Sequence, residues 1–152
     1  MPKFNTSAIP LLPALAVDAA CSGNPGVLEF RGVVVESEQA LHNAAAPVEA
    51  FRRGPFPIGT NNIGEFLALV LGLAWLKANK LDWNLYSDSV TALAWVRNRK
   101  AKTNLPRNSQ TEELYQMIAK AELWLKQNTY STRIYKWDTD KWGEVPADYG
   151  RK

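Results

Sequence analysis

Two residue types that build many catalytic sites are nearly absent from this chain of 152 residues, which holds one cysteine and one histidine. The single cysteine, Cys21, excludes a disulfide within the chain and is typical of a protein kept in a reducing compartment. The single histidine, His42, excludes a histidine-rich zinc site, and no nucleophile motif accompanies it to form a Ser-His-Asp triad. Any chemistry must therefore rest on other side chains.

Long apolar runs are also lacking. The longest, at residues 66–76, is far shorter than the roughly 20 residues that a helix needs to cross a bilayer. Pro10 and Pro13 interrupt the N-terminal stretch, and no basic region precedes an apolar run there, so it makes a poor signal peptide. We therefore expect a soluble, cytoplasmic protein.

The excess of positive charge is small, with a formal net charge of +3. Cations gather at residues 97–107, just past a helical segment. This basic run is either a solvated helix end, since cations favour helix C-termini, or a surface for a polyanion. The length favours a single domain over residues 1–152, and we expect residues 1–14 to form an N-terminal arm on the sheet edge.

The order of the predicted elements indicates an α/β fold. Three consecutive strands on tight turns favour an antiparallel meander, and later strands that arrive through helical crossovers extend it. The sequence thus predicts a mixed five-stranded sheet, three antiparallel strands plus two parallel ones, flanked by helices. The expected strands are residues 15–20, 27–35, 48–59, 83–88 and 131–137, and the expected helices are 61–80, 89–100 and 111–128.

Helix ends and faces can also be predicted. Asn61 or Asn62 is the expected N-cap of the first long helix, with Glu65 in its first turn. Ser89 is the expected N-cap of the next helix. In the helix at 111–128, Leu123 belongs to the apolar residues that we expect to face mostly inward.

Four carboxylates occupy unusual places on this layout. Asp18 lies inside an apolar strand, Glu65 lies near the start of the first long helix, Asp88 ends the fourth strand, and Asp148 follows the fifth. Strand C-termini and the loops after them are where sites form in open α/β sheets. An unpaired buried charge is costly, and a divalent cation removes that cost. Acids without histidine or cysteine favour Mg²⁺ or Mn²⁺ over Zn²⁺.

Each acid also has a simpler interpretation. Asp18 could start a turn, Glu65 could complement the helix dipole, and Asp88 could cap the helix that begins near Ser89. The presence of all four in this element order favours one shared site over separate explanations.

Five ordered segments resemble the type 1 ribonuclease H family (RNase HI), specifically the bacterial branch with Glu in place of an active-site-loop His. They are VDAACSGNPG, GTNNIGEFLALVLGL, YSDSVTALAWV, AKTNLPRN and KWDTDKWGEVPADYGRK, running from Val17 to Lys152. The resemblance implies an RNase H-like fold and endonucleolytic hydrolysis of the RNA strand of RNA/DNA hybrids, leaving 3′-hydroxyl and 5′-phosphate ends. It also implies two Mg²⁺ ions about 4 Å apart, with Mn²⁺ as a substitute, that clamp the scissile phosphate and activate water.

The same resemblance assigns a role to each acid. Asp18 would bridge both ions, Asp148 would complete the ion on the nucleophile side, and Glu65 and Asp88 would hold the ion on the leaving-group side. Glu144 would replace the loop His and help metal and product to leave. The other interpretation of Glu144 is a surface carboxylate in a mobile loop.

Substrate contacts are implied as well. Trp95 would lie against the DNA backbone, or else it is a core tryptophan at helical spacing. We expect a monomer without a small-molecule cofactor. The residues that would face RNA 2′-hydroxyls are Cys21, Ser22, Gly23, Asn24 and Asn61, and those of a pocket for a DNA-strand phosphate are Thr60, Asn62, Thr103 and Asn104.

The sequence departs from the family pattern in three ways. Val90 stands where close relatives often have a Gln that contacts RNA, residues 97–110 are too short for a basic handle helix, and no separate hybrid-binding domain is expected. We therefore expect weak, strongly salt-dependent binding. Two other functions remain open: a non-catalytic module that binds RNA/DNA hybrids or R-loops, and a nuclease of the same fold that acts on DNA. The intact set of acids argues against the first, and the segments that would face 2′-hydroxyls argue against the second.

Overall fold

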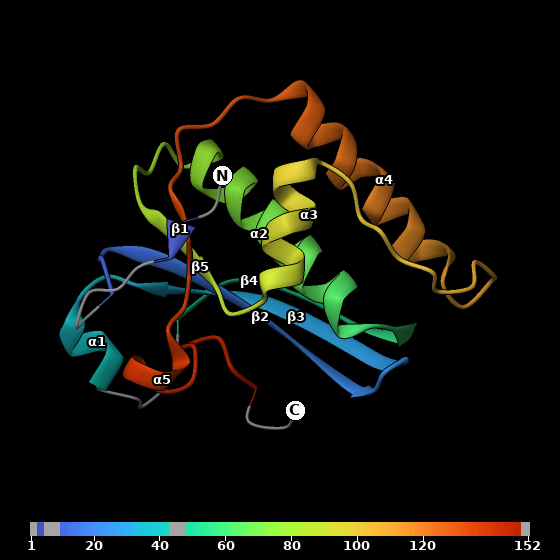
Figure 1. The fold of residues 1–152 in the computed structure, drawn as a ribbon, viewed down its shortest axis with the longest axis horizontal. Coiled ribbons are helices and arrows are strands. Elements are labelled where there is room, and N and C mark those ends of the chain that lie inside the picture. The colour runs from blue at the N-terminus through green and yellow to red at the C-terminus, as the bar shows by residue number, and fades with distance from the viewer. Residues whose placement is uncertain (1–2, 5–9, 43–47, 150–152) are drawn as a thin grey trace.

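The computed structural model describes residues 3–4, 10–42 and 48–149. It contains one mixed sheet in the order β1-β6-β5-β2-β3-β4, with the long helices packed on one side (Figure 1). The strands are β1 (Lys3–Phe4), β2 (Ala14–Gly23), β3 (Gly26–Val35), β4 (Val48–Gly59), β5 (Asn84–Ser87) and β6 (Ile134–Lys136). The helices are α1 (Glu38–His42), α2 (Asn61–Ala78), α3 (Val90–Asn98), α4 (Glu112–Gln127) and α5 (Thr139–Trp142).

Strands β2, β3 and β4 form the expected antiparallel meander. A tight turn joins β2 to β3, and Gly23 and Gly26 face each other across it. Gly23 has a φ of 90°, which favours glycine, and a Cβ on Gly26 would lie 1.9 Å from the carbonyl oxygen of Ser22. The hairpin therefore depends on glycine at both positions.

Strands β5 and β6 extend the meander in parallel, which confirms the predicted mixed five-stranded sheet. The two-residue β1 adds a sixth strand, parallel to β6, at the sheet edge. Further along the chain, the Leu11 N–H donates to the Tyr86 hydroxyl at 2.7 Å, and the Leu11 carbonyl accepts from Asn84 Nδ2 at 3.2 Å. Both partners belong to β5, so Leu11 is held beside that strand.

The helix ends differ in part from those predicted. Thr60 is the N-cap of α2, and its Oγ1 accepts the Ile63 N–H at 3.3 Å, so the prediction of Asn61 or Asn62 was wrong. Because α2 begins at Asn61, Glu65 also lies beyond the first turn rather than within it. Ser89 caps α3 as predicted, with its Oγ accepting the Ala92 N–H at 3.1 Å.

One face of the sheet, here called the helical face, carries most of the core. Leu15 and Val17 of β2 alternate with residues of the other face and pack with Phe66 and Leu69 of α2. Helix α4 covers α2 from outside (Figure 1). Leu123 was expected to face inward, but it is 51% exposed, because the inward side of α4 is formed by other positions. These are Leu114, Ile118, Ala121 and Leu125.

The opposite face, here called the tail face, is covered by residues 137–149, here called the tail. Trp137 is 1% exposed, and its ring meets those of Tyr86 and Trp142 edge to face at 5.5 and 4.9 Å. The tail includes α5, which lies on the side of the sheet away from α2 (Figure 1). The buried residues of this smaller cluster are Ala14, Ala16, Val33, Val35, Tyr86, Trp137, Val145 and Ala147.

In the ranges that the structure describes, no helix combines the length and the hydropathy that a membrane span requires.

Candidate metal centre

Strand register brings two of the predicted acids together. The parallel pairing of β2 with β5 runs from Ala14 opposite Asn84 to Ala16 opposite Tyr86. Asp18 and Asp88 each lie two residues beyond the last of these pairs. Parallel strands advance in step, so equal offsets from one pair place both acids at the same edge of the sheet.

Glu65 reaches the same place from helix α2. Its Oε1 accepts the Ala19 N–H at 2.8 Å, and its Oε2 accepts from the Ser87 hydroxyl at 3.4 Å. The carboxylate thus links β2 to β5 just where their ladder has ended. A Cβ on Gly64 would lie 2.7 Å from the Ala19 Cβ, so glycine at this position lets α2 approach β2 closely enough.

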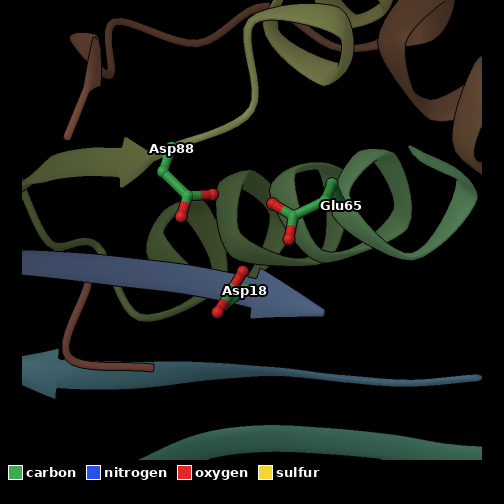
Figure 2. Close-up of side chains that lie close together, drawn as sticks. All are labelled: Asp18, Glu65 and Asp88. Atoms are coloured by element: carbon green, nitrogen blue, oxygen red, sulfur yellow. The ribbon is translucent and has the colours of Figure 1, made fainter. Parts of the chain in front are cut away.

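The three acids form a compact oxygen cluster, in which Asp18, Glu65 and Asp88 offer ligand atoms within 4.8 Å of one another. Asp18 and Glu65 are fully buried and Asp88 is half-buried, and the three side chains lie close together where β2, β5 and α2 meet (Figure 2). Close like charges with little access to water repel each other, and a cation relieves that repulsion. Oxygen ligands alone suit hard divalent ions, so this cluster could bind metal ions.

Asp148 lies outside this cluster among the residues that the structure describes. Its main chain is nevertheless fixed: its carbonyl accepts from Arg31 Nη2 at 2.8 Å, and its N–H donates to the Val145 carbonyl at 2.8 Å. The structure thus brings three of the four predicted ligands together and holds the fourth on the docked tail.

Glu144 is exposed at the bend of the tail between α5 and the buried Val145. The carbonyl of the preceding Gly143 accepts the Trp137 indole N–H at 2.9 Å, and Gly143 itself has a φ of 76°. The main chain before Glu144 is therefore anchored, while its side chain faces solvent.

The residues predicted to face RNA lie on the β2–β3 hairpin and at the start of α2. Ser22, Gly23 and Asn24 are exposed on the β2–β3 hairpin, and the Asn24 side-chain oxygen accepts the Asn61 N–H at 3.1 Å. This bond ties the hairpin to the start of α2. Cys21 is half-buried with its thiol near the Gly59 carbonyl at 3.4 Å, and burial raises the pKa of the thiol.

The residues predicted for a phosphate pocket belong to two elements. Thr60 and Asn62 lie at the start of α2, where the Thr60 hydroxyl oxygen already serves as the helix cap. Thr103 and Asn104 lie in the loop between α3 and α4, and Thr103 Oγ1 accepts the Leu105 N–H at 3.2 Å.

That loop is anchored on α4. The Ala101 N–H donates to a Glu122 carboxylate oxygen at 2.9 Å, and the Tyr115 hydroxyl donates to the Leu105 carbonyl. These bonds flank Thr103 and Asn104 on both sides and fix the course of the main chain there.

Trp95 is placed in the core. It is 8% exposed and meets Phe66 edge to face, with ring centroids 5.9 Å apart. This is the packing arrangement that helical spacing allowed.

Two polar residues near the cluster were not predicted from the sequence. Ser87 is fully buried and bonds Glu65, and Arg31 is 8% exposed and lies directly opposite Asp18 in the β2–β3 ladder. An arginine inside the apolar run LEFRGVVV was the available signal for Arg31, because a buried guanidinium needs several acceptors.

The sheet order β4-β3-β2-β5-β6 with its helices is an RNase H-like fold. No family model matches the chain. LC11-RNase H1, isolated from compost by a metagenomic approach, is 18% identical, with 84% of this chain and 85% of that one covered and a TM-score of 0.53. At this identity the likeness shows the fold.

Two further solved structures are similar. RNase H1 from the halophilic archaeon Halobacterium salinarum NRC-1 is 20% identical, covers 81% of this chain and 80% of its own, and has a TM-score of 0.46. LC11-RNase H1 in complex with an RNA/DNA hybrid is 17% identical, covers 87% of this chain and 89% of its own, and has a TM-score of 0.49.

Proposed function

We propose that this protein is an endonuclease that hydrolyses the RNA strand of RNA/DNA hybrids and leaves 3′-hydroxyl and 5′-phosphate ends. The observation that carries the proposal is the cluster of Asp18, Glu65 and Asp88 at the carboxyl ends of β2 and β5 in an RNase H-like sheet. The five sequence segments that resemble type 1 ribonucleases H support the choice of substrate.

The chain's own residues would hold two Mg²⁺ ions, with Mn²⁺ as a substitute. Asp18 would contact both ions, Glu65 and Asp88 would complete one, and Asp148 the other. When bound, such ions stabilise the charge that develops on a phosphate and lower the pKa of water. The bonds from Ala19 and Ser87 orient both oxygens of Glu65 before any ion arrives, which lowers the cost of ordering the site.

Substrate recognition would use the surface formed by the β2–β3 hairpin and the start of α2. The bond between Asn24 and Asn61 keeps this surface in one piece. Its groups would contact the 2′-hydroxyls that distinguish RNA from DNA. Thr103 and Asn104 would contact a phosphate of the DNA strand, while Trp95 offers a partner only the exposed 8% of its surface.

Glu144 would assist the departure of metal and product. Its exposed position on the tail, outside the buried cluster, suits a group that binds ions transiently. An exposed carboxylate at this position could bind a departing metal ion and release it to solvent without disturbing the buried acids.

The test is a cleavage assay with one end-labelled RNA strand presented as a hybrid with DNA, as a duplex with RNA, and alone. Each form is incubated with Mg²⁺, with Mn²⁺ and with a chelator. We expect metal-dependent cleavage of the hybrid only, and a rate at least about a thousandfold lower for Asp18→Asn, because losing metal stabilisation costs several kcal/mol.

The matched control is Asp82→Asn, which removes an exposed carboxylate bonded to Arg133 at 3.7 Å. It should cleave like the unmodified protein. Hybrid binding without cleavage under any metal would replace the proposal with a binding module. Cleavage of duplex DNA at a rate equal to that of the hybrid would replace it with a DNA nuclease.

A further inference from the structure

Arg31 occupies a special position relative to the metal centre. It is the cross-strand partner of Asp18 in the antiparallel β2–β3 ladder. Side chains of such a pair point to the same face, and Val33, two residues further along β3, lies in the tail-face cluster. Arg31 therefore stands on the tail face, beside Asp18, and is only 8% exposed.

All three nitrogen atoms of the Arg31 guanidinium donate hydrogen bonds. Nε donates to the Ala147 carbonyl and Nη2 to the Asp148 carbonyl, both at 2.8 Å. Nη1 donates to Glu49 Oε2 at 2.9 Å, and this acid is also bonded by Arg52 at 2.6 Å. Hydrogen bonding to Arg52, and then to Arg31, holds the pKa of Glu49 below its usual value, so the acid stays charged at neutral pH.

The tail also packs on the flat surface of the guanidinium. The Tyr149 ring lies 4.6 Å from the Arg31 guanidinium carbon and 5.3 Å from that of Arg52. Arg31 thus binds the carbonyls of Ala147 and Asp148 in the plane of its guanidinium, and the Tyr149 ring packs on the flat surface of that group.

The hydrogen bonds from Arg31 give the tail a directional constraint that its apolar contacts lack. Val145 and Ala147 are buried against the sheet, but apolar packing is not directional and allows a segment to slide. A fork of two donors on two consecutive carbonyls fixes both position and orientation. The direction of the Asp148 Cα–Cβ bond, from which its carboxylate extends, follows from the main chain that Arg31 holds.

We propose that Arg31 is the positioning residue for Asp148: the strand partner of the first metal ligand sets where the tail presents the last one. This inference rests on the proposed function, because it assigns to Asp148 the role of a metal ligand. Arg31 itself touches neither metal nor substrate and acts through the tail.

The test compares Arg31→Met, which removes the fork, with Arg31→Lys, which keeps the charge but not the paired donors. The control is Arg53→Met, an exposed arginine on the neighbouring strand β4 whose side chain donates to the Arg52 carbonyl at 2.9 Å. The first measurement is hydrogen exchange of the backbone N–H groups of Val145, Ala147, Asp148 and Tyr149, which needs neither metal nor substrate. We expect exchange there to accelerate about tenfold or more in both Arg31 variants and to stay unchanged in the control.

The second measurement separates positioning from general destabilisation. For Arg31→Met we expect kcat on the hybrid to fall about 10- to 100-fold, the range seen when groups that orient metal ligands are lost, with KM within about twofold. Arg31→Lys should lie between Arg31→Met and the unmodified protein. Thermal melts without metal first establish that each variant is fully folded at the assay temperature, so that a lower folded fraction cannot explain the fall in rate. Lost positioning should then raise the Mg²⁺ concentration needed for half-maximal rate.

A double-mutant cycle with Asp148→Asn completes the test, read as the rise in melting temperature that Mn²⁺ produces. If Arg31 acts through Asp148, Arg31→Met lowers this rise in the unmodified background and changes nothing further in the Asp148→Asn background. Equal losses in both backgrounds, or unchanged exchange of residues 145–149, would overturn the inference. A protein that shows the exchange and Mn²⁺ effects but cleaves no hybrid would refute the proposed function and leave the positioning role standing.

Discussion

The two faces of the sheet hold the residues of the proposed metal centre in different ways. On the helical face, the position of Glu65 follows from packing of α2 on β2, and its carboxylate is bonded to both strands. On the tail face, Asp148 belongs to a segment with little regular structure, held by Arg31 and by a small aromatic cluster.

This difference indicates which part of the proposed site is rigid and which part can move. Asp18 and Glu65 are fully buried on β2 and α2, and Asp88 directly follows β5, so their positions depend on strand register and on the large core. Asp148 and Glu144 depend on a few contacts of the tail. Local opening draws on such weakly held segments, and its free energy can lie well below that of global unfolding.

The largest effect is expected from removing the Trp137 side chain, which lies at the centre of the tail-face cluster. Trp137→Ala should lower the free energy of unfolding by about 3 to 5 kcal/mol, because a fully buried indole leaves a cavity. Its ring contacts with Tyr86 and Trp142 are lost as well. Denaturant unfolding measures the loss, and cleavage should fall even under conditions where the protein remains folded.

The matched change on the helical face is Leu125→Ala in α4, at a side chain that is 1% exposed. It should cost about 2 to 5 kcal/mol of stability and leave cleavage by the folded protein near normal. Equal losses of cleavage for the two variants would show that the faces do not differ as described.

The next largest effect is the gain in free energy of unfolding that we expect from metal binding. Mn²⁺ at about 100 times its dissociation constant should add about 2.7 kcal/mol to the free energy of unfolding, because the ion binds only the folded protein. Thermal melts with and without chelator measure this gain. Asp18→Asn should abolish it, and Glu144→Gln should preserve it. A gain that survives Asp18→Asn would place the metal elsewhere.

A smaller effect is expected at the exposed acid of the tail. Glu144→Gln should lower kcat about tenfold, near 1.4 kcal/mol, with stability unchanged, because the side chain is exposed and the main chain around it keeps its bonds. Steady-state kinetics with multiple turnovers measure kcat, and a single-turnover experiment should show less slowing if release is the affected step. Asp140→Asn, at another exposed tail acid, serves as the control.

The smallest effect concerns the acid that supports Arg31. The pKa of Glu49 is lowered, so its ionised form stabilises the fold fully above the usual value of 4.5 and loses this contribution as pH falls through the folded-state pKa. Glu49→Gln should therefore cost less than about 1 kcal/mol at pH 7, since the pair is partly exposed. Unfolding curves from pH 7 to pH 3 should show the difference disappear at the acid end.

The control for Glu49 is Glu113→Gln on the exposed side of α4, for which we expect no comparable difference at either pH. A Glu49→Gln deficit that grew as the pH fell would contradict the assigned sign.

Much of the framework could be predicted from the sequence because its signals are local. Alternating and helical periodicities located the strands and long helices, and Asp18 stood out as a charge in an apolar strand. The hairpin sequence around Gly23 and Gly26 predicted a tight turn. Each of these features depends on residues within one element or its neighbour.

Other features depend on distant partners and left weak local traces. β1 and α5 are two and four residues long, too short for a period. Thr60 rather than Asn61 caps α2, because the end of β4 determines which side chain lies close enough to accept the first free N–H groups of the helix. The partners of Arg31 could not be found from the sequence, since its bonds to the tail carbonyls span 116 and 117 residues.

Those spans have a consequence for the order of folding. The tail binds to Arg31 of β3 and to Tyr86 of β5, so its docking surface exists only after the sheet has formed. Closing a long loop costs entropy that contacts within it must first offset, which makes contacts of high sequence separation late events. We therefore expect the tail to dock after the sheet has formed, and the proposed nuclease activity to return later than the secondary structure during refolding.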